Sequence, residues 1–143
     1  MRQLSVALAL ALAAFVTSVA VVFARPPQQQ TVWSGVYSDA QAFRGEKVAD
    51  TRCIGCHGSN FDGGDSGPKL VGPAFLANWS SQSVAELFNW IQEAMPADTP
   101  GTLTKDESAA VVAYILKLNK MPAGKQDLPA DGEALRGIQI VEK

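Results

Sequence analysis

Three segments of the chain place apolar residues at the spacing of an amphipathic α-helix: residues 38–52, 83–94 and 104–118. Each opens with a serine or threonine that is followed three residues later by glutamine or glutamate. Such a pair satisfies free backbone N–H groups at a helix N-terminus and therefore marks where each helix begins. Pro96 and Pro122 lie just past the second and third segments and end them. The pattern predicts an all-α fold.

The first of these segments has a glycine, Gly45, in its middle. A glycine inside a helix costs roughly 1 kcal/mol relative to alanine. It therefore indicates a place where another helix approaches closely. The apolar positions around it are Ala40, Phe43, Val48 and Ala49.

The first 24 residues have the features of an export signal. Arg2 supplies an early positive charge, residues 4–16 are apolar or small, and small residues recur at positions 18, 20 and 24. We expect cleavage after Ala20 or Ala24. The alternative is an uncleaved membrane anchor, because no charge interrupts residues 3–24. Either outcome predicts a periplasmic protein, soluble or anchored to the membrane by residues 1–24.

The rest of the chain has room for one domain. Residues 25–37 begin as a polar, proline-containing spacer and continue as a hydrophobic strap that we expect across the domain surface. Residues 38–125 hold the predicted helices. Residues 126–143 form a mixed tail, in which we expect Leu128 to pack and the last residues to fray.

Charge and cysteine usage narrow the function classes. The 143-residue chain has 12 basic and 14 acidic residues, a formal net charge of −2, and no basic run or basic helix face. This balance argues against nucleic acid as a partner. Both cysteines lie in one short motif, so the chain has no disulfide framework.

That motif, Cys53-Ile54-Gly55-Cys56-His57, has the C-x-x-C-H pattern of c-type haem attachment. Two thiols at this spacing reach the two vinyl groups of a porphyrin and form thioethers, and the adjacent histidine gives an imidazole nitrogen to the iron. The pattern predicts one covalently bound haem c. The alternatives are a redox disulfide and half of a zinc site. A zinc site would need a carboxylate, since the chain has no other cysteine or histidine.

The second protein ligand of such an iron is therefore Met95, Met121, a lysine, or none. Met95 ends the second helical segment, in a stretch with Pro100 and Gly101 that is expected to be an extended loop. Met121 follows the last helix and would have to reach back over the ring. We favour Met95 on placement alone, because a methionine elsewhere usually fills gaps in a core.

The stretch after His57 contains two further candidates. Residues 58–67 are rich in glycine and aspartate, but they lack the ligand spacing of a phosphate or calcium loop. Pro68 follows in a rigid turn that can present a backbone carbonyl to the imidazole N–H and raise its basicity. Trp79 is a candidate to donate its indole N–H to a haem propionate, with simple core packing as the alternative.

Residues 43–120 resemble the class I cytochromes c in order and spacing. Gly45 stands eight residues before the first cysteine, where that family has a small residue at the crossing of its first and last helices. Tyr114 is similar to the aromatic that packs on it, and Pro68 and Met95 match the family's loop proline and axial methionine. The resemblance implies a cytochrome c fold, with three to four helices wrapped around one covalently bound haem.

A closer resemblance is to the small cytochromes that are linked to quinoprotein (PQQ) dehydrogenases. It rests on residues 32–37, on Met95-Pro96 with Pro100-Gly101, on residues 113–116 and on the tail 119–128. It implies a carrier that accepts electrons from a periplasmic alcohol-type dehydrogenase and passes them to a cytochrome or an oxidase. Fold and motif alone do not name the partner.

The leading hypothesis is a monohaem electron-transfer protein that is not itself an enzyme. A haem subunit inside a larger dehydrogenase or oxidase is a second hypothesis, which the sequence separates poorly from a free carrier. A peroxidase-like or ligand-binding haem protein is the third. It requires an open sixth position and a distal donor, and the chain has no second histidine.

Overall fold

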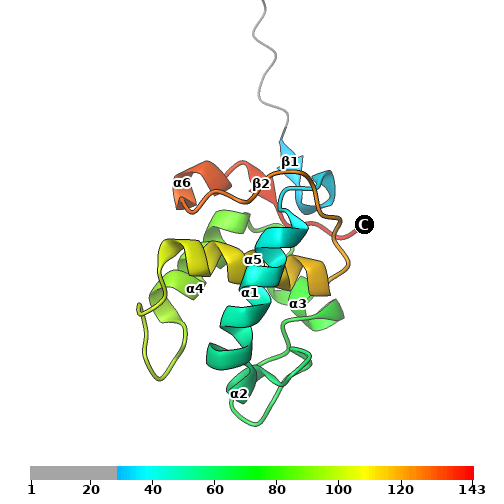
Figure 1. Cartoon of the computed structure of the whole chain (residues 1–143). Helices are drawn as coiled ribbons and strands as arrows, with labels where there is room; N and C mark the ends of the chain where they lie inside the picture. The colour runs from blue at the N-terminus through cyan, green and yellow to red at the C-terminus, as the bar shows by residue number, and fades with distance from the viewer. Residues whose placement is uncertain (1–28) are drawn as a thin grey trace, which may run out of the picture.

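The structure, a computed structural model, describes residues 29–143. The predicted signal or anchor segment, residues 1–24, and the first part of the spacer lie outside the described residues. Figure 1 shows a helical domain in which α1 and α5 cross near the middle and a pair of short strands closes one end. Within the described range, none of the helices is long and apolar enough to span a membrane.

Four helices of the described chain exceed one turn: α1 (Asp39–Arg52), α3 (Gly72–Trp79), α4 (Val84–Ala94) and α5 (Lys105–Leu118). Short turns form α2 (Ile54–His57), α6 (Gly132–Leu135) and the 3-10 helix η1 (Val32–Ser34). The strands β1 (Gln30–Thr31) and β2 (Ile138–Gln139) pair in parallel. The all-α prediction and its three helices are confirmed, whereas α3 and the strand pair were not predicted.

The sequence did not reveal α3 because this helix has no start signal of its own. Val71 occupies the N-cap position and makes no side-chain hydrogen bond, and the helix opens with Gly72-Pro73. A Gly-Pro pair ordinarily marks a turn. Most of the following residues are apolar, so the helix also lacks the two-faced pattern by which the other three were found.

The predicted capping pairs form completely at α4 and α5 but not at α1. The Ser38 hydroxyl accepts from the Gln41 N–H as expected, but the Gln41 side chain does not return to Ser38. It binds the backbone of Leu128 instead, donating from Nε2 to the carbonyl at 2.9 Å and accepting at Oε1 from the N–H at 2.7 Å. The reciprocal half of this capping box is therefore wrong, and Gln41 ties α1 to the C-terminal tail.

The helices α1 and α5 cross closely at Gly45, as predicted. A Cβ at this position would collide with the backbone carbonyl of Ala110 and stand 3.0 Å from the Tyr114 Cβ. The buried face of α1 is therefore made of the small residues Ala42, Gly45 and Ala49, together with Gln41 at its N-terminal end.

The predicted apolar face of α1 is wrong in part, because Ala40 and Phe43 point to solvent. Phe43 is 55% exposed, and the Lys47 ammonium lies 4.9 Å from its ring centroid. A phenylalanine does not fit the narrow gap that the Gly45 crossing leaves between the helices. The helix is therefore rotated to put its smallest residues against α5.

The strap and the tail pack on each other at the end of the domain remote from α2 (Figure 1). The Trp33 indole N–H donates to the Val141 carbonyl at 2.9 Å. Leu128 is buried, as expected. Ile138 and Ile140 are also buried, so the expected fraying is wrong for these positions. Backbone hydrogen bonds from this segment to the strap and to the residues before α4 hold it in place.

Replacing Gly45 tests the helix crossing. Overpacking costs about 1–3 kcal/mol, and a clash with a backbone carbonyl belongs at the upper end, so Gly45→Ala should lower the free energy of unfolding by about 3 kcal/mol. Helix propensity alone would raise it by about 1 kcal/mol. Denaturant unfolding measures the sign. Gly137→Ala is the control, since a Cβ there meets nothing within 4 Å. Unchanged or increased stability of Gly45→Ala would contradict the close crossing.

Candidate functional site

A cavity of about 260 Å³ lies where the end of α1 meets α4 and α5. Its lining includes five of the six site residues predicted from the sequence: Cys53, Cys56, His57, Pro68 and Met95. The sixth, Trp79, lines an adjoining cavity of about 200 Å³. The two cavities share six lining residues: His57, Pro68, Leu70, Ile91, Met95 and Ile115. The two adjoining cavities are together called the slot below.

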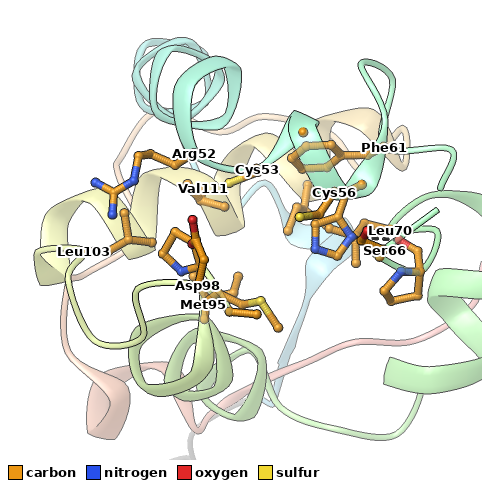
Figure 2. Close-up of a pocket in the computed structure, with 18 of the residues that line it drawn as sticks. Arg52, Cys53, Cys56, Phe61, Ser66, Leu70, Met95, Asp98, Leu103 and Val111 are labelled. Atoms are coloured by element: carbon orange, nitrogen blue, oxygen red, sulfur yellow. Dashed lines mark hydrogen bonds between the residues drawn. The ribbon is translucent and has the colours of Figure 1, made fainter. Parts of the chain in front are cut away.

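The single turn of α2 positions the two cysteines. Cys53 ends α1 and begins α2, because its N–H donates to the Ala49 carbonyl at 2.9 Å and its carbonyl accepts from the His57 N–H at 3.0 Å. One turn then separates Cys53 from Cys56. Figure 2 shows both cysteine sulfur atoms along one side of the slot and Met95 on the opposite side.

The burial of Cys53 argues against a redox disulfide. Cys53 is half-buried, whereas Cys56 is exposed. Burial raises the pKa of the Cys53 thiol to about 11, and the opposing effect of the Arg52 charge is smaller. Redox-active thiols instead have lowered pKa values. Residues 29–143 also bring together no three His, Cys, Asp or Glu side chains able to hold a metal ion, as the zinc alternative would require.

His57 is 8% exposed, and its Nδ1 lies 2.8 Å from the Pro68 carbonyl oxygen. A carbonyl can only accept, so Nδ1 carries a proton and Nε2 is the nitrogen left to bind a metal. The structure thus places the Pro68 carbonyl where the sequence predicted it. Such an outer hydrogen bond fixes the orientation of a ligating imidazole and raises its basicity.

Sequence reasoning missed Phe61, which the loop 58–67 folds into the core. Its side chain is fully buried, with its ring centroid 6.0 Å from that of His57 and 5.6 Å from that of Tyr114. The Leu70 N–H donates to its carbonyl at 2.8 Å. The sequence did offer a signal for this burial, because Phe61 is the one aromatic residue in a loop that is rich in glycine and aspartate. Phe61 therefore packs beside the imidazole and links it to α5.

The two candidate methionines lie in different environments. Met95 caps the C-terminus of α4 and lines both parts of the slot. Met121 is 3% exposed and lines neither, and its carbonyl accepts from the Tyr37 hydroxyl at 2.6 Å. The geometry therefore agrees with the placement that favoured Met95. Of the lysines, Lys69 lines the smaller cavity.

The loop that follows Met95 is tied to the end of α1 by Arg52, another residue that the sequence did not single out. The Arg52 guanidinium donates to the Thr102 hydroxyl at 2.5 Å. At the base of the loop, the Gln92 side chain donates to the Leu103 carbonyl at 2.7 Å. The partners lie 50 residues apart for Arg52 and 11 residues apart for Gln92, so no short sequence motif predicts either bond. They hold the wall of the slot next to Met95.

The smaller cavity brings two tryptophans together. Trp79, at the end of α3, and Trp90, on α4, both line it. Trp90 is 55% exposed and was missed because its position in the sequence resembles an ordinary helix surface position. This end of the slot also carries the side chains of Lys69 and Asn78. The end of the slot away from the cysteines therefore has potential hydrogen-bond donors in Trp79, Trp90, Lys69 and Asn78.

The residues of the slot fit a haem c. Two free thiols lie on one side, a buried imidazole has its Nε2 available, and a thioether lies opposite the cysteines. These are the donors that attach and ligate such a group. The walls between them are mostly apolar, with Leu70, Ile91, Leu103, Val111 and Ile115, and they also include Thr51, Arg52, Ser66 and Asp98.

Comparison with known proteins points to the same kind of site. The family model described as cytochrome C oxidase, cbb3-type, subunit III matches residues 40–115, slightly more than half of the chain. Among solved structures, a chain of the sulfane dehydrogenase SoxCD from Paracoccus pantotrophus is similar, with a TM-score of 0.52 and 18% identity. The match covers 75% of this chain and 61% of that chain, and it shows the fold alone. No curated protein matches the sequence.

A side chain at Gly67 tests how the His57 ring is held. In Gly67→Ala the new Cβ would stand 2.9 Å from both His57 Nδ1 and the Cys56 carbonyl oxygen, so the ring or the loop must move. We expect a weaker bond to Pro68, visible in nitrogen NMR as faster solvent exchange of the Nδ1 proton. His57 is the only histidine, so its ring signals are unambiguous.

The matched control for Gly67→Ala is Ser66→Ala, at the exposed neighbouring position. This variant should keep the wild-type exchange rate. Equal exchange of the Nδ1 proton in both variants would show that Gly67 does not constrain the ring.

Proposed function

The chain belongs to the c-type cytochrome family described as cytochrome c oxidase, cbb3-type, subunit III, and on that basis we propose that it carries single electrons on one haem c bound covalently in the slot. Family membership implies haem c binding and electron transfer. The observation that carries the finer proposal is the meeting of two thiols, a buried imidazole and a thioether on one apolar slot.

Each predicted site residue has a distinct role in this proposal. Cys53 and Cys56 would hold the haem, because their S–H bonds can add across its two vinyl groups to form thioethers with no atom lost. His57 Nε2 and the Met95 sulfur would be the protein ligands of its iron. Trp79 lies at the end of the slot away from the cysteines, where the propionates of a ring fixed by its vinyl edge would lie. The haem supplies one-electron chemistry, with iron alternating between its ferric and ferrous forms.

The residues around the proposed haem would shift its reduction potential in opposite directions. The Met95 thioether is a soft ligand that favours ferrous iron, and an apolar slot disfavours the additional charge of ferric iron. The Pro68 carbonyl acts the other way, because it makes the His57 imidazole a stronger donor. We expect the first two effects to prevail, as they do for His/Met ligation in general.

Ligation of the iron by both His57 and Met95 would favour a carrier over a catalyst. The iron would then have no open position for a substrate, and electrons would pass through the edge of the ring. A peroxidase-like function requires a distal donor, and the chain has no second histidine to act as one. Electron transfer is therefore the function that this set of residues supports best.

For the partners, we propose a periplasmic quinoprotein-type dehydrogenase as electron donor and a cytochrome or oxidase as acceptor. The export-type segment at residues 1–24 supports the compartment. The resemblance to dehydrogenase-linked cytochromes over the strap, the Met95 loop and the tail supports the donor. The similar solved chain also comes from a dehydrogenase, although that likeness extends only to the fold.

A second candidate function is that of a haem subunit within a larger dehydrogenase or oxidase. The observation that favours it is the exposure of two large hydrophobic side chains, Phe43 and Trp90, each 55% exposed. Exposed aromatics are enriched where proteins meet. Purification of the protein from its native membrane and periplasmic fractions separates the two functions, because a subunit copurifies with a large partner and a carrier elutes alone.

The ligand role of Met95 is tested by two matched substitutions in the haem-loaded protein. Met95→Leu should abolish the weak ferric absorption band near the red edge, lower the reduction potential and allow carbon monoxide to bind the ferrous form. Each change follows from loss of the sulfur ligand with side-chain volume nearly conserved. Met121→Leu should leave all three unchanged, because Met121 packs away from the slot.

The opposite pattern, with the band lost only in Met121→Leu, would reject the ligand assignment. Ready binding of carbon monoxide to the wild-type protein would show an open iron and move the catalytic or sensing hypothesis to the front.

A further inference from the structure

The side chain of Asn119 makes three hydrogen bonds to backbone groups, two of them in residues 70–72 and one on α5. Its Oδ1 accepts from the Gly72 N–H at 2.9 Å. Its Nδ2 donates to the Leu70 carbonyl at 2.9 Å and to the Ile115 carbonyl at 2.8 Å. Because one partner is a donor and the other two are acceptors, the orientation of the amide is determined by its surroundings.

The bond between the Gly72 N–H and Asn119 Oδ1 supplies the side-chain acceptor that the N-terminus of α3 lacks. Val71, at the N-cap position, has no side-chain acceptor, and Pro73 has no N–H. The Gly72 N–H therefore depends on a partner from elsewhere in the chain, and Asn119 provides it from the end of α5. An asparagine on one helix thus acts as the N-cap of another helix that lines the slot.

The bond from Asn119 Nδ2 to the Leu70 carbonyl holds the backbone segment that contacts His57. Leu70 is held from both directions, since its N–H donates to the Phe61 carbonyl at 2.8 Å and its carbonyl accepts from Asn119. Two residues earlier, the Pro68 carbonyl lies 2.8 Å from His57 Nδ1. Asn119 is therefore connected to the imidazole by one hydrogen bond to Leu70, the backbone of residues 68–70, and one hydrogen bond between Pro68 and His57.

We propose that Asn119 is a positioning residue that holds the Pro68 carbonyl against His57 and thereby sets the donor strength of the axial imidazole. This inference rests on the proposed function, because it concerns the same haem site. Asn119 does not line the slot, so it acts only through the backbone that it holds. Without it, the Gly72 N–H and the Leu70 carbonyl lose their partners and the segment 68–72 loosens. The imidazole then becomes a weaker donor to ferric iron, and the reduction potential rises.

Two variants of the haem-loaded protein separate the acceptor role of Asn119 from its donor roles. Asn119→Asp keeps an acceptor for the Gly72 N–H but removes the donors to Leu70 and Ile115, and Asn119→Ala removes all three bonds. In both, the Nδ1 proton of His57 should exchange with solvent about fivefold faster, as expected for the weakening of one hydrogen bond. The reduction potential should rise in both variants. If Asn119→Ala fails to fold, Asn119→Asp carries the test.

Gln41→Met is the matched control, because Gln41 is also a side-chain amide that bridges a helix to distant backbone, through two hydrogen bonds to Leu128. It should lower thermal stability to a similar degree but leave the His57 proton exchange and the potential at their wild-type values. Neither Gln41 nor Leu128 lines the slot.

The outcomes separate the two proposals. Asn119 variants that lose stability as Gln41→Met does, yet keep the wild-type exchange rate and potential, would show that Asn119 is only structural and overturn the inference, while the haem assignment stands. A wild-type protein that matures without a haem ligated by His57 would overturn both.

Discussion

The close crossing of α1 and α5 at Gly45 is the constraint on which the site depends. It brings the backbone of α1 against the Ala110 carbonyl and leaves room on that face of α1 only for small side chains. The C-terminal end of α1 is thereby directed at the slot, where Cys53 begins the attachment turn. The same helix α5 supplies the apolar wall at Val111 and Ile115. Fold and site are therefore consequences of one helix contact.

Around this contact, the site is assembled from segments that hold one another through hydrogen bonds. The Pro68 carbonyl orients His57, the Phe61 carbonyl holds Leu70, and the Arg52 side chain ties down the loop after Met95. Neutral backbone groups make two of these three contacts. This arrangement suits a carrier, since rigid ligands need little rearrangement when one electron arrives or leaves.

The sequence predicted the parts of the site that depend on local chemistry. The spacing of Cys53, Cys56 and His57 and the proline-linked Met95 follow from what a porphyrin requires, and the structure places them on one slot. The capping bonds of α4 and α5 are equally local. Contacts between distant residues were missed, because the outward face of Phe43, the burial of Phe61 and the start of α3 each depend on a partner far along the chain. Such partners leave no mark in any short window of sequence.

The central claim is that one iron lies between His57 and Met95 in a ring attached through both cysteines. Crystallography of the matured protein at the iron absorption edge tests it most directly, because the anomalous signal locates the metal independently of the fold. The account predicts one iron peak in the slot, bonded to His57 Nε2 and to the Met95 sulfur. An iron ligated by Lys69 or Met121, an iron with no second protein ligand, or no iron in the slot would contradict it.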